Sequence, residues 1–238
     1  MCIRDRITSY VQDTTDFVNK IKAQKFSGTV FIISMDVTSL YPNIDHKEGI
    51  EACEQFLDKR SHKSVPSNIL KKLISLVLRL NTLSFGGRFF QQIKGTAMGT
   101  PMAVNYANLF MGRFEEDLLK SYEQQYGKRP ALWLRFIDDV FVVWQGNLED
   151  FKNFIHYCDN FASSNKYKSS IRFTSSPPSK TADFLDTTVS VNADGTLSTN
   201  LYTKPTASYQ YIHRNSYHTK HVTKSLPKSQ FMRIRRIC

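Results

Sequence analysis

Two stretches of the chain are almost continuously apolar, and both contain aspartates. Residues 27–37 and 132–144 are rich in large and β-branched side chains, which predicts buried β-strands. Asp36 lies at the C-terminal end of the first run. The second run predicts a β-hairpin with Asp138 and Asp139 in its tight turn. The pattern therefore predicts acidic side chains at the ends of buried strands.

Between these runs, apolar residues recur at helical spacing. A capping box at 45–48 predicts a helix that ends near Arg60, and Pro66 predicts the start of a second helix. Thr100 as N-cap and Pro101 predict a long helix through about Tyr122. Another helix is expected over 148–161.

The remaining segments read as strands. Residues 81–93 predict a hairpin that turns at Gly86-Gly87, and further strands are expected at 171–174, 183–191 and 197–203. The order of strand, helices, hairpin, helix and strands favours an α+β fold, with an antiparallel sheet backed by a layer of helices.

Length and composition narrow the class of protein. The chain has 238 residues, 41% of them hydrophobic, and contains no apolar run of the roughly 18 residues that a membrane span requires. Its four cysteines form no C-x-x-C pair, so neither a zinc knuckle nor a disulfide framework is indicated. We expect a soluble intracellular protein that does not contact a membrane.

The charge is strongly basic and unevenly distributed. The net charge is +11, yet from Gly195 to Cys238 there are eight Lys and Arg residues and no Asp or Glu. Tyrosines and a phenylalanine are interleaved with these bases, a mixture that can neutralise phosphates and stack on bases. Nucleic-acid binding and a solvated basic tail are both compatible with this segment.

The paired carboxylates carry the clearest chemical signal. Asp138 and Asp139 lie within a run of large apolar side chains, where ionised carboxylates are costly unless cations or hydrogen bonds compensate. Together with Asp36 they could hold two Mg²⁺ ions, which prefer oxygen ligands and complete their octahedra with phosphates and water. A pair of turn aspartates without metal is the alternative.

Several segments resemble one family of polymerases. Phe136-Ile137-Asp138-Asp139 resembles the (Y/F)-x-D-D signature of reverse transcriptases, 36–44 (DVTSLYPNI) their first palm motif, and 94–101 (KGTAMGTP) their glycine-rich second motif. With the FLD and K-P-T segments that follow, the chain is most similar to the Penelope-like retroelement reverse transcriptases, which are related to telomerase. The resemblance covers roughly residue 26 to the end.

The resemblance implies roles for individual residues at the metal centre. Asp36 and Asp138 would be the principal ligands of two Mg²⁺ ions, for which Mn²⁺ can substitute, with Asp139 in support and the Val37 carbonyl as a backbone ligand. Tyr41 would lie beneath the sugar of the incoming nucleotide and exclude a 2′-hydroxyl. A tyrosine at this position also argues against an RNA polymerase of viral type, which usually has a second aspartate there.

Further residues would contact the nucleotide or the nucleic acid. Gly95 and Gly99 would let the backbone approach a nucleotide or template base. Lys94 stands where most reverse transcriptases have glutamine, so we expect it to contact a phosphate or the template. Lys180 would protonate the departing pyrophosphate, unless it is a surface lysine.

The resemblance also divides the chain. Residues 1–25 are expected to be an N-terminal remnant, 26–203 a reverse transcriptase palm with part of the fingers, and 204–238 a basic segment that begins the thumb. In that segment we expect contacts to the template-primer duplex, made by four basic side chains: Lys204, Arg233, Arg235 and Arg236.

The resulting hypothesis is an RNA-directed DNA polymerase domain of a retroelement, which transfers dNTP to a primer 3′ end on an RNA template. The alternative is an inactive truncated remnant that only binds nucleic acid. Because only 35 residues precede Asp36, we expect another segment or an additional chain to supply the fingers. A nuclear location is expected if the source is a eukaryotic retroelement.

Overall fold

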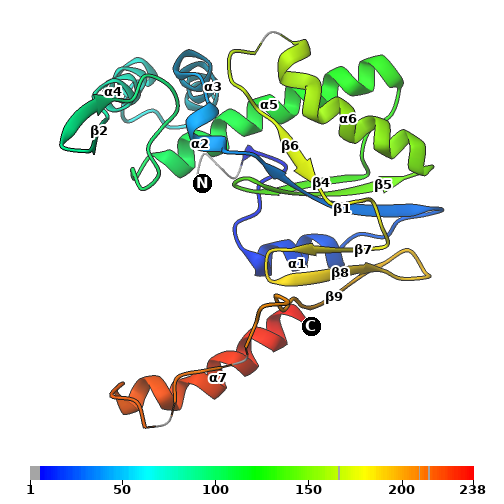
Figure 1. Cartoon of the computed structure of the whole chain (residues 1–238). Coiled ribbons are helices and arrows are strands. Elements are labelled where there is room, and N and C mark those ends of the chain that lie inside the picture. Colours follow the sequence, from blue (N-terminus) through cyan, green and yellow to red (C-terminus); the bar gives the residue numbers. More distant parts are fainter. Residues whose placement is uncertain (1–5, 166, 209, 214) are drawn as a thin grey trace.

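A four-stranded antiparallel sheet lies at the centre of the protein. The computed structural model describes residues 6–238 except 166, 209 and 214. The sheet order is β4-β5-β1-β6, and its strands are β4 (Leu132–Phe136), β5 (Asp139–Gln145), β1 (Val30–Val37) and β6 (Phe173–Ser175). Helices α5 (Ala103–Tyr126) and α6 (Leu148–Ser164) cover one face (Figure 1). The predicted antiparallel sheet backed by helices is confirmed.

The opposite face of the sheet is also covered. Helix α1 (Thr14–Lys22) and a second antiparallel sheet lie beneath it (Figure 1). The strands of this second sheet are β7 (Thr181–Phe184), β8 (Thr187–Val191) and β9 (Leu197–Leu201). The central strands are therefore apolar on both faces, which explains why their sequences show runs rather than alternation.

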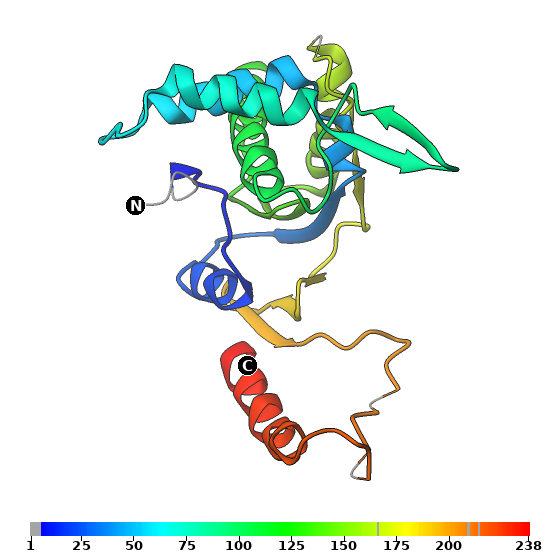
Figure 2. The same ribbon diagram turned by 90° about the vertical axis from the view of Figure 1, so that its left-hand side faces the viewer.

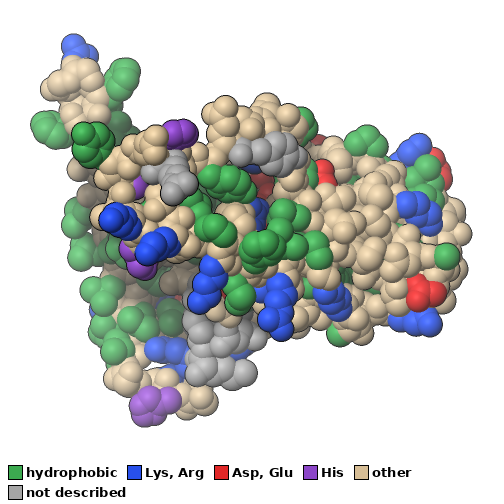
Figure 3. Space-filling view, turned by 90° about the horizontal axis from the view of Figure 1, so that it is seen from below, with side chains coloured by type: hydrophobic (Ala, Val, Ile, Leu, Met, Phe, Trp, Pro, Cys, Tyr) green, Lys and Arg blue, Asp and Glu red, His purple; other side chains and the backbone are tan. Residues whose placement is uncertain are grey.

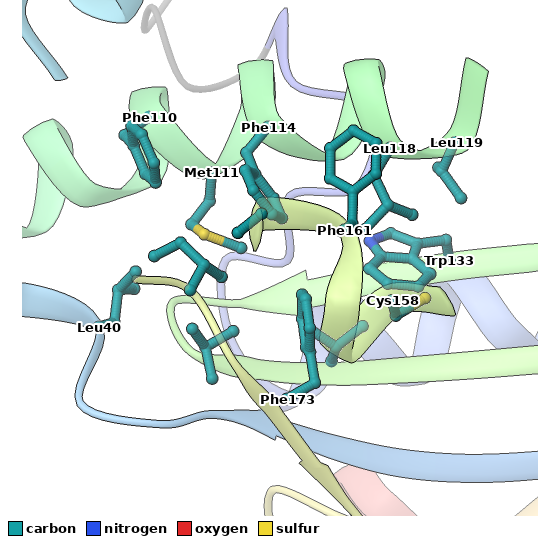
Figure 4. Packing of buried hydrophobic residues seen from close by; sticks show 14 of the residues in the cluster. Leu40, Phe110, Met111, Phe114, Leu118, Leu119, Trp133, Cys158, Phe161 and Phe173 are labelled. Atoms are coloured by element: carbon teal, nitrogen blue, oxygen red, sulfur yellow. The ribbon is translucent and has the colours of Figure 1, made fainter. Parts of the chain in front are cut away.

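Each face of the central sheet has its own apolar cluster. In β1, Ile33 and Met35 face the helices, whereas Val30 and Ile32 face the second sheet. The cluster under α5 and α6 contains most of the large aromatic side chains, including Trp133, which lies between the sheet and the helices (Figure 4). Complete burial of such side chains contributes about 1.5–3 kcal/mol each, so both layers are firmly held to the sheet.

Residues 6–25, the described part of the segment that was expected to be an N-terminal remnant, pack into the core. Phe17 and Ile21 of α1 are fully buried in the cluster beneath the sheet, and Phe17 packs edge-on against Phe141 of β5. Val11 is fully buried as well. Residues 6–25 thus complete the core on one face of the central sheet.

Several local predictions need smaller corrections. The expected single strand over 183–191 is two strands, because Leu185 has a positive φ of +53° and the chain reverses there. The long helix begins at Ala103 without a side-chain cap, rather than at Pro101. In the capping box, Asp45 accepts hydrogen bonds from the backbone of Lys47 and Glu48, but the Glu48 carboxylate binds the 168–169 backbone instead of that of Asp45.

A helical layer and a hairpin extend to one side of the sheet (Figure 2). The elements are α2 (Leu40–Asn43), α3 (His46–Asp58), α4 (Ser67–Arg79), β2 (Thr82–Phe85) and β3 (Arg88–Gln91). Helix α4 buries only Leu78. The apolar side chains of Leu73 and Leu76 in this helix, and of Phe89 in the hairpin, are exposed. This part of the chain therefore presents an apolar surface to its surroundings.

The basic C-terminal segment ends in a helix that the sequence patterns did not predict. Helix α7 (Lys220–Ile237) is joined to the second sheet at its C-terminal end (Figure 1). Ile237 is buried and its carbonyl accepts a hydrogen bond of 2.5 Å from the Thr199 hydroxyl of β9. The N-terminal half of α7 projects away from the body of the protein (Figure 2).

Among the helices that the structure describes, none has both the length and the apolar character needed to cross a membrane.

Candidate active site

Strand register brings the predicted aspartates together. Asp36 of β1 lies directly opposite Asp139 of β5, so residues about 100 positions apart in sequence are cross-strand neighbours. The backbone N–H of Val37 donates a 3.0 Å hydrogen bond to the carbonyl of Asp138, which fixes the hairpin turn against the end of β1. The turn itself is strained, because Ile137 has a φ of +55°, an uncommon conformation for a β-branched residue.

The three carboxylates influence one another electrostatically. Partial loss of solvation, followed by the charges of Asp138 and Asp36, raises the pKa of Asp139 to about 6. Desolvation, and after it the charge of Asp138, also raise the pKa of Asp36. The protein alone therefore does not compensate these charges, as expected for a site that gathers carboxylates for a cation.

The donor set fits a hard divalent cation. Two carboxylates of neighbouring strands and a third in the adjoining turn offer oxygen ligands only, which is the chemistry that Mg²⁺ prefers. Over residues 6–238 with their three gaps, no three Asp, Glu, His or Cys side chains have already converged on one point.

Tyr41 lies close to these carboxylates. It belongs to α2, which follows a left-handed residue, Ser39, at the end of β1. The ring is half-buried and packs against the cluster under the helices. Burial and the neighbouring charge of Asp138 raise the pKa of the Tyr41 hydroxyl, so the ring and that carboxylate share one surface.

The glycine-rich loop is fastened to the same turn. The Gly95 N–H donates to the Ile44 carbonyl at 3.0 Å, and the Thr96 N–H donates to the Tyr41 carbonyl at 2.9 Å. A Cβ at Gly95 would lie 2.4 Å from the Pro42 Cα and 2.5 Å from the Tyr41 oxygen. No side chain fits there, so the contact between protein backbones is sufficient to require glycine at position 95.

The other residues predicted in this loop have different surroundings. The Lys94 ammonium donates a 3.1 Å hydrogen bond to the Ser170 hydroxyl, on the loop that leads into β6. Gly99 has a φ of +91° and no atoms within 4 Å of a Cβ position, so it is open to a ligand. The structure thus brings Asp36, Tyr41 and Gly95 into one region together with Asp138 and Asp139.

Lys180, which was predicted to protonate the departing pyrophosphate, lies away from the three carboxylates in this structure. Its ammonium donates a 2.6 Å hydrogen bond to the Val30 carbonyl and lies 5.1 Å from the centre of the Phe31 ring. Val30 begins β1 and Asp36 lies near its other end, about 20 Å away at roughly 3.3 Å per residue. Lys180 therefore stabilises the opposite end of the sheet.

Among the four bases predicted to bind nucleic acid, Arg233 has an intramolecular partner. Its guanidinium donates to the Asp186 carboxylate at 2.7 Å, which joins α7 to the turn between β7 and β8. Lys204, Arg235 and Arg236 are exposed. Seen from the side of α7, Lys and Arg side chains alternate with apolar ones and few acidic side chains are visible (Figure 3). Tyr209 and Arg214 of the same segment lie outside the described residues.

A buried polar network that no sequence pattern predicted lies behind the aspartate turn. Arg135 of β4 is completely buried and forms a 2.6 Å ion pair with Glu115 of α5. The same guanidinium donates to the Asn108 side chain at 2.7 Å and to the Ile137 carbonyl at 2.8 Å. The available signal was an arginine at position 135 in the middle of an apolar strand.

Comparison with known proteins gives a family and a set of similar folds. The profile of the family described as reverse transcriptase (RNA-dependent DNA polymerase) matches residues 3–176. No curated protein sequence matches the chain.

Among solved structures, the chain is similar to telomerase from Candida albicans in complex with a TWJ fragment of telomeric RNA, with a TM-score of 0.66 and 12% identity over 98% of this chain. It is also similar to a truncated apo telomerase from Candida tropicalis, with a TM-score of 0.60 and 14% identity over 82% of this chain. The chain spans 41% of each telomerase chain. The RNA-dependent RNA polymerase of BmCPV, at 13% identity, has a TM-score of 0.54 over 83% of this chain and 19% of that one.

Proposed function

The chain belongs to the reverse transcriptase family, and we propose that it performs RNA-directed DNA polymerisation at the site formed by Asp36, Asp138 and Asp139. The observation that carries this proposal is the pairing of Asp36 with Asp139 across β1 and β5, with Asp138 in the adjoining turn. The metal ions and the substrates named below are part of the proposal.

The metal ligands we propose are the carboxylates of Asp36 and Asp138, with Asp139 in support and the Val37 carbonyl as a backbone ligand. A pair of Mg²⁺ ions, or Mn²⁺ in their place, would activate the primer 3′-hydroxyl and stabilise the leaving pyrophosphate. The residues of the chain keep the carboxylates at the strand ends, because the Val37 N–H binds the Asp138 carbonyl. A bound cation would favour the ionised form of Asp139, whose pKa is raised to about 6 by desolvation and by the neighbouring carboxylates.

The proposed substrate is dNTP, and Tyr41 is the residue that selects it. The ring lies next to Asp138 and packs against the cluster under the helices, which supports a fixed ring that would exclude a 2′-hydroxyl. The same feature disfavours RNA synthesis, although the fold is also similar to an RNA polymerase.

An RNA template and a DNA primer are the proposed nucleic-acid partners. The exposed bases Lys204, Arg235 and Arg236 lie in a segment without carboxylates, which supports phosphate binding. We assign this segment, residues 204–238, to the beginning of a thumb. Arg233 contributes differently, since it holds α7 to the second sheet through Asp186.

The exposed apolar surface of α4 and the β2–β3 hairpin supports a further part of the proposal. Leu80 is 67% exposed and Phe89 83% exposed, and large apolar side chains are rarely gathered in this way without a partner. We propose that a fingers segment, from a longer protein or from an additional chain, covers this surface. The motif resemblance supports a Penelope-like retroelement as the source, with a nuclear location if its host is eukaryotic.

Primer extension tests the proposed activity. The full chain is incubated with an RNA template, a DNA primer, Mg²⁺ or Mn²⁺, and either dNTP or rNTP. Extension with dNTP that Asp138→Asn abolishes supports the polymerase. Duplex binding without extension by the unmodified chain would support the alternative, a remnant that only binds nucleic acid, and a preference for rNTP would support an RNA polymerase.

A further inference from the structure

Arg135 is the most unusual side chain in the core. It is 0% exposed and lies on β4 beneath α5, one residue before the strand runs into the aspartate turn. Burial of an unpaired guanidinium is very unfavourable, so its position depends on its partners. Those partners are Glu115, Asn108 and the backbone of Ile137.

Glu115 neutralises this charge and is fully occupied in doing so. One carboxylate oxygen accepts from Arg135 at 2.6 Å and from the Trp133 indole at 2.9 Å. The other oxygen accepts from the Ser9 hydroxyl at 2.6 Å. The carboxylate is 3% exposed, so water does not compete with these hydrogen bonds. The Glu115 carboxylate is therefore held from three sides by donors that water does not replace.

The segment before α1 is part of the same network. The Arg135 N–H donates to the Ser9 carbonyl at 2.6 Å, and the Val11 N–H donates to the Arg135 carbonyl at 2.8 Å. Ile7 packs against Gly112 of α5, where a Cβ would lie 3.0 Å from its side chain. Residues 7–11 thus lie along the edge strand β4, where they contact both its backbone and the carboxylate that holds Arg135.

On the other side, the network reaches the turn that presents Asp138. The Ile137 carbonyl accepts the 2.8 Å hydrogen bond from Arg135, and the next carbonyl, that of Asp138, accepts the one from the Val37 N–H. The carbonyls of Ile137 and Asp138, in a turn strained by the positive φ of Ile137, are therefore both held by donors outside the turn. Of these two restraints, only the one from Arg135 comes from a side chain.

We propose that Arg135 and Ser9 are positioning residues for the metal centre, and that residues 7–11 hold the aspartate turn in its observed conformation, at the end of β1, through Glu115 and Arg135. The inference rests on the proposed function for the identity of the metal centre. It assigns a role to a segment that carries none of the polymerase motifs. Loss of the Arg135 bond would let Ile137 leave its positive φ and would disperse the carboxylates before any metal binds.

The test compares Mn²⁺ affinity, measured by electron paramagnetic resonance of the free ion, in the unmodified full chain and in variants. Arg135→Lys keeps the charge opposite Glu115 but cannot reach Glu115, Asn108 and Ile137 together, so we expect Mn²⁺ binding about 10–100-fold weaker. Ser9→Ala removes one bond to Glu115 and should weaken Mn²⁺ binding about 2–5-fold. Leu118→Ala is the control, because it removes a fully buried side chain of α5 without a bond to the turn.

Primer extension by the same variants separates the inference from the proposed function. If the unmodified chain binds Mn²⁺ but does not extend a primer, the proposed function fails while the affinities still test the network. Affinity losses in Arg135→Lys and Ser9→Ala, with Leu118→Ala unchanged, support the inference. It is overturned if a folded Arg135→Lys binds Mn²⁺ as the unmodified chain does, or if Leu118→Ala loses as much affinity. Should Arg135→Lys not fold, unchanged affinity in Ser9→Ala overturns it.

Discussion

Replacement of Gly95 by alanine tests the contact between the glycine-rich loop and the Tyr41 turn. The new Cβ would lie 2.4 Å from the Pro42 Cα and 2.5 Å from the Tyr41 oxygen, and neither backbone atom can rotate away. Alanine would also have to adopt a φ of +74°. The left-handed conformation costs about 1–2 kcal/mol, and overpacking costs about 1–3 kcal/mol more. We therefore expect Gly95→Ala to lower the free energy of unfolding by about 2–5 kcal/mol.

Gly87 offers a matched control. It has the same φ of +74°, but no atom lies within 4 Å of its Cβ position. Gly87→Ala should therefore cost only the conformational part, about 1–2 kcal/mol. Urea unfolding of both variants, followed by the fluorescence of the buried Trp133 and Trp144, gives the two values. If Gly95→Ala costs no more than Gly87→Ala, the loop does not contact the Tyr41 turn in solution and the reasoning is refuted.

Three further predictions concern the site and the basic segment. Because the pKa of Asp139 is raised to about 6 in the folded chain, the folded state favours the protonated carboxyl. The stability that this preference contributes is fully present below about pH 4 and is lost as the pH rises through 6. In EDTA, Asp139→Asn should therefore stabilise the chain by about 1–2 kcal/mol at pH 7.5, after allowance for solvent screening, and equal stabilities at that pH in urea unfolding would contradict this. Tyr41→Ala should let rNTP compete with dNTP in primer extension, and an unaltered preference for dNTP would refute its role. The double replacement of Arg235 and Arg236 by alanine should reduce the slope of log affinity against log salt concentration in duplex binding by about two units. Arg233→Ala should change this slope less. It should instead lower the stability of the fold, because the ion pair with Asp186 is lost.

Most of the central fold could be predicted from the sequence, because it depends on local patterns. The apolar runs at β1 and the β4–β5 hairpin identify buried strands, and the aspartates within them mark the candidate site. Asp138 and Asp139 are consecutive in the sequence, so their proximity needs no tertiary structure. Helices α5 and α6 follow from their spacing of apolar residues, although their ends differ by a few residues.

Helices α1 and α7 were not predicted, for a physical reason. Helix α1 has only three buried residues, and its position depends on contacts with Phe141 and Phe184, which are far away in sequence. Helix α7 is strongly basic and contains Pro227, so its composition argues against a helix. Its C-terminal end is stabilised instead by Thr199 and Asp186 of the second sheet.

The residue types that could serve a metal-dependent polymerase can be read directly from the chain, as can the places where acidic side chains interrupt apolar strands. Which of these side chains meet was set by the tertiary structure. It placed Asp36 opposite Asp139, because strand register is a long-range property. It moved Lys180 to the far end of β1, where it binds the Val30 carbonyl. It also buried Arg135 with Glu115 behind the aspartate turn, an arrangement that no local pattern encodes, because each partner is tolerated in the core only in the presence of the other.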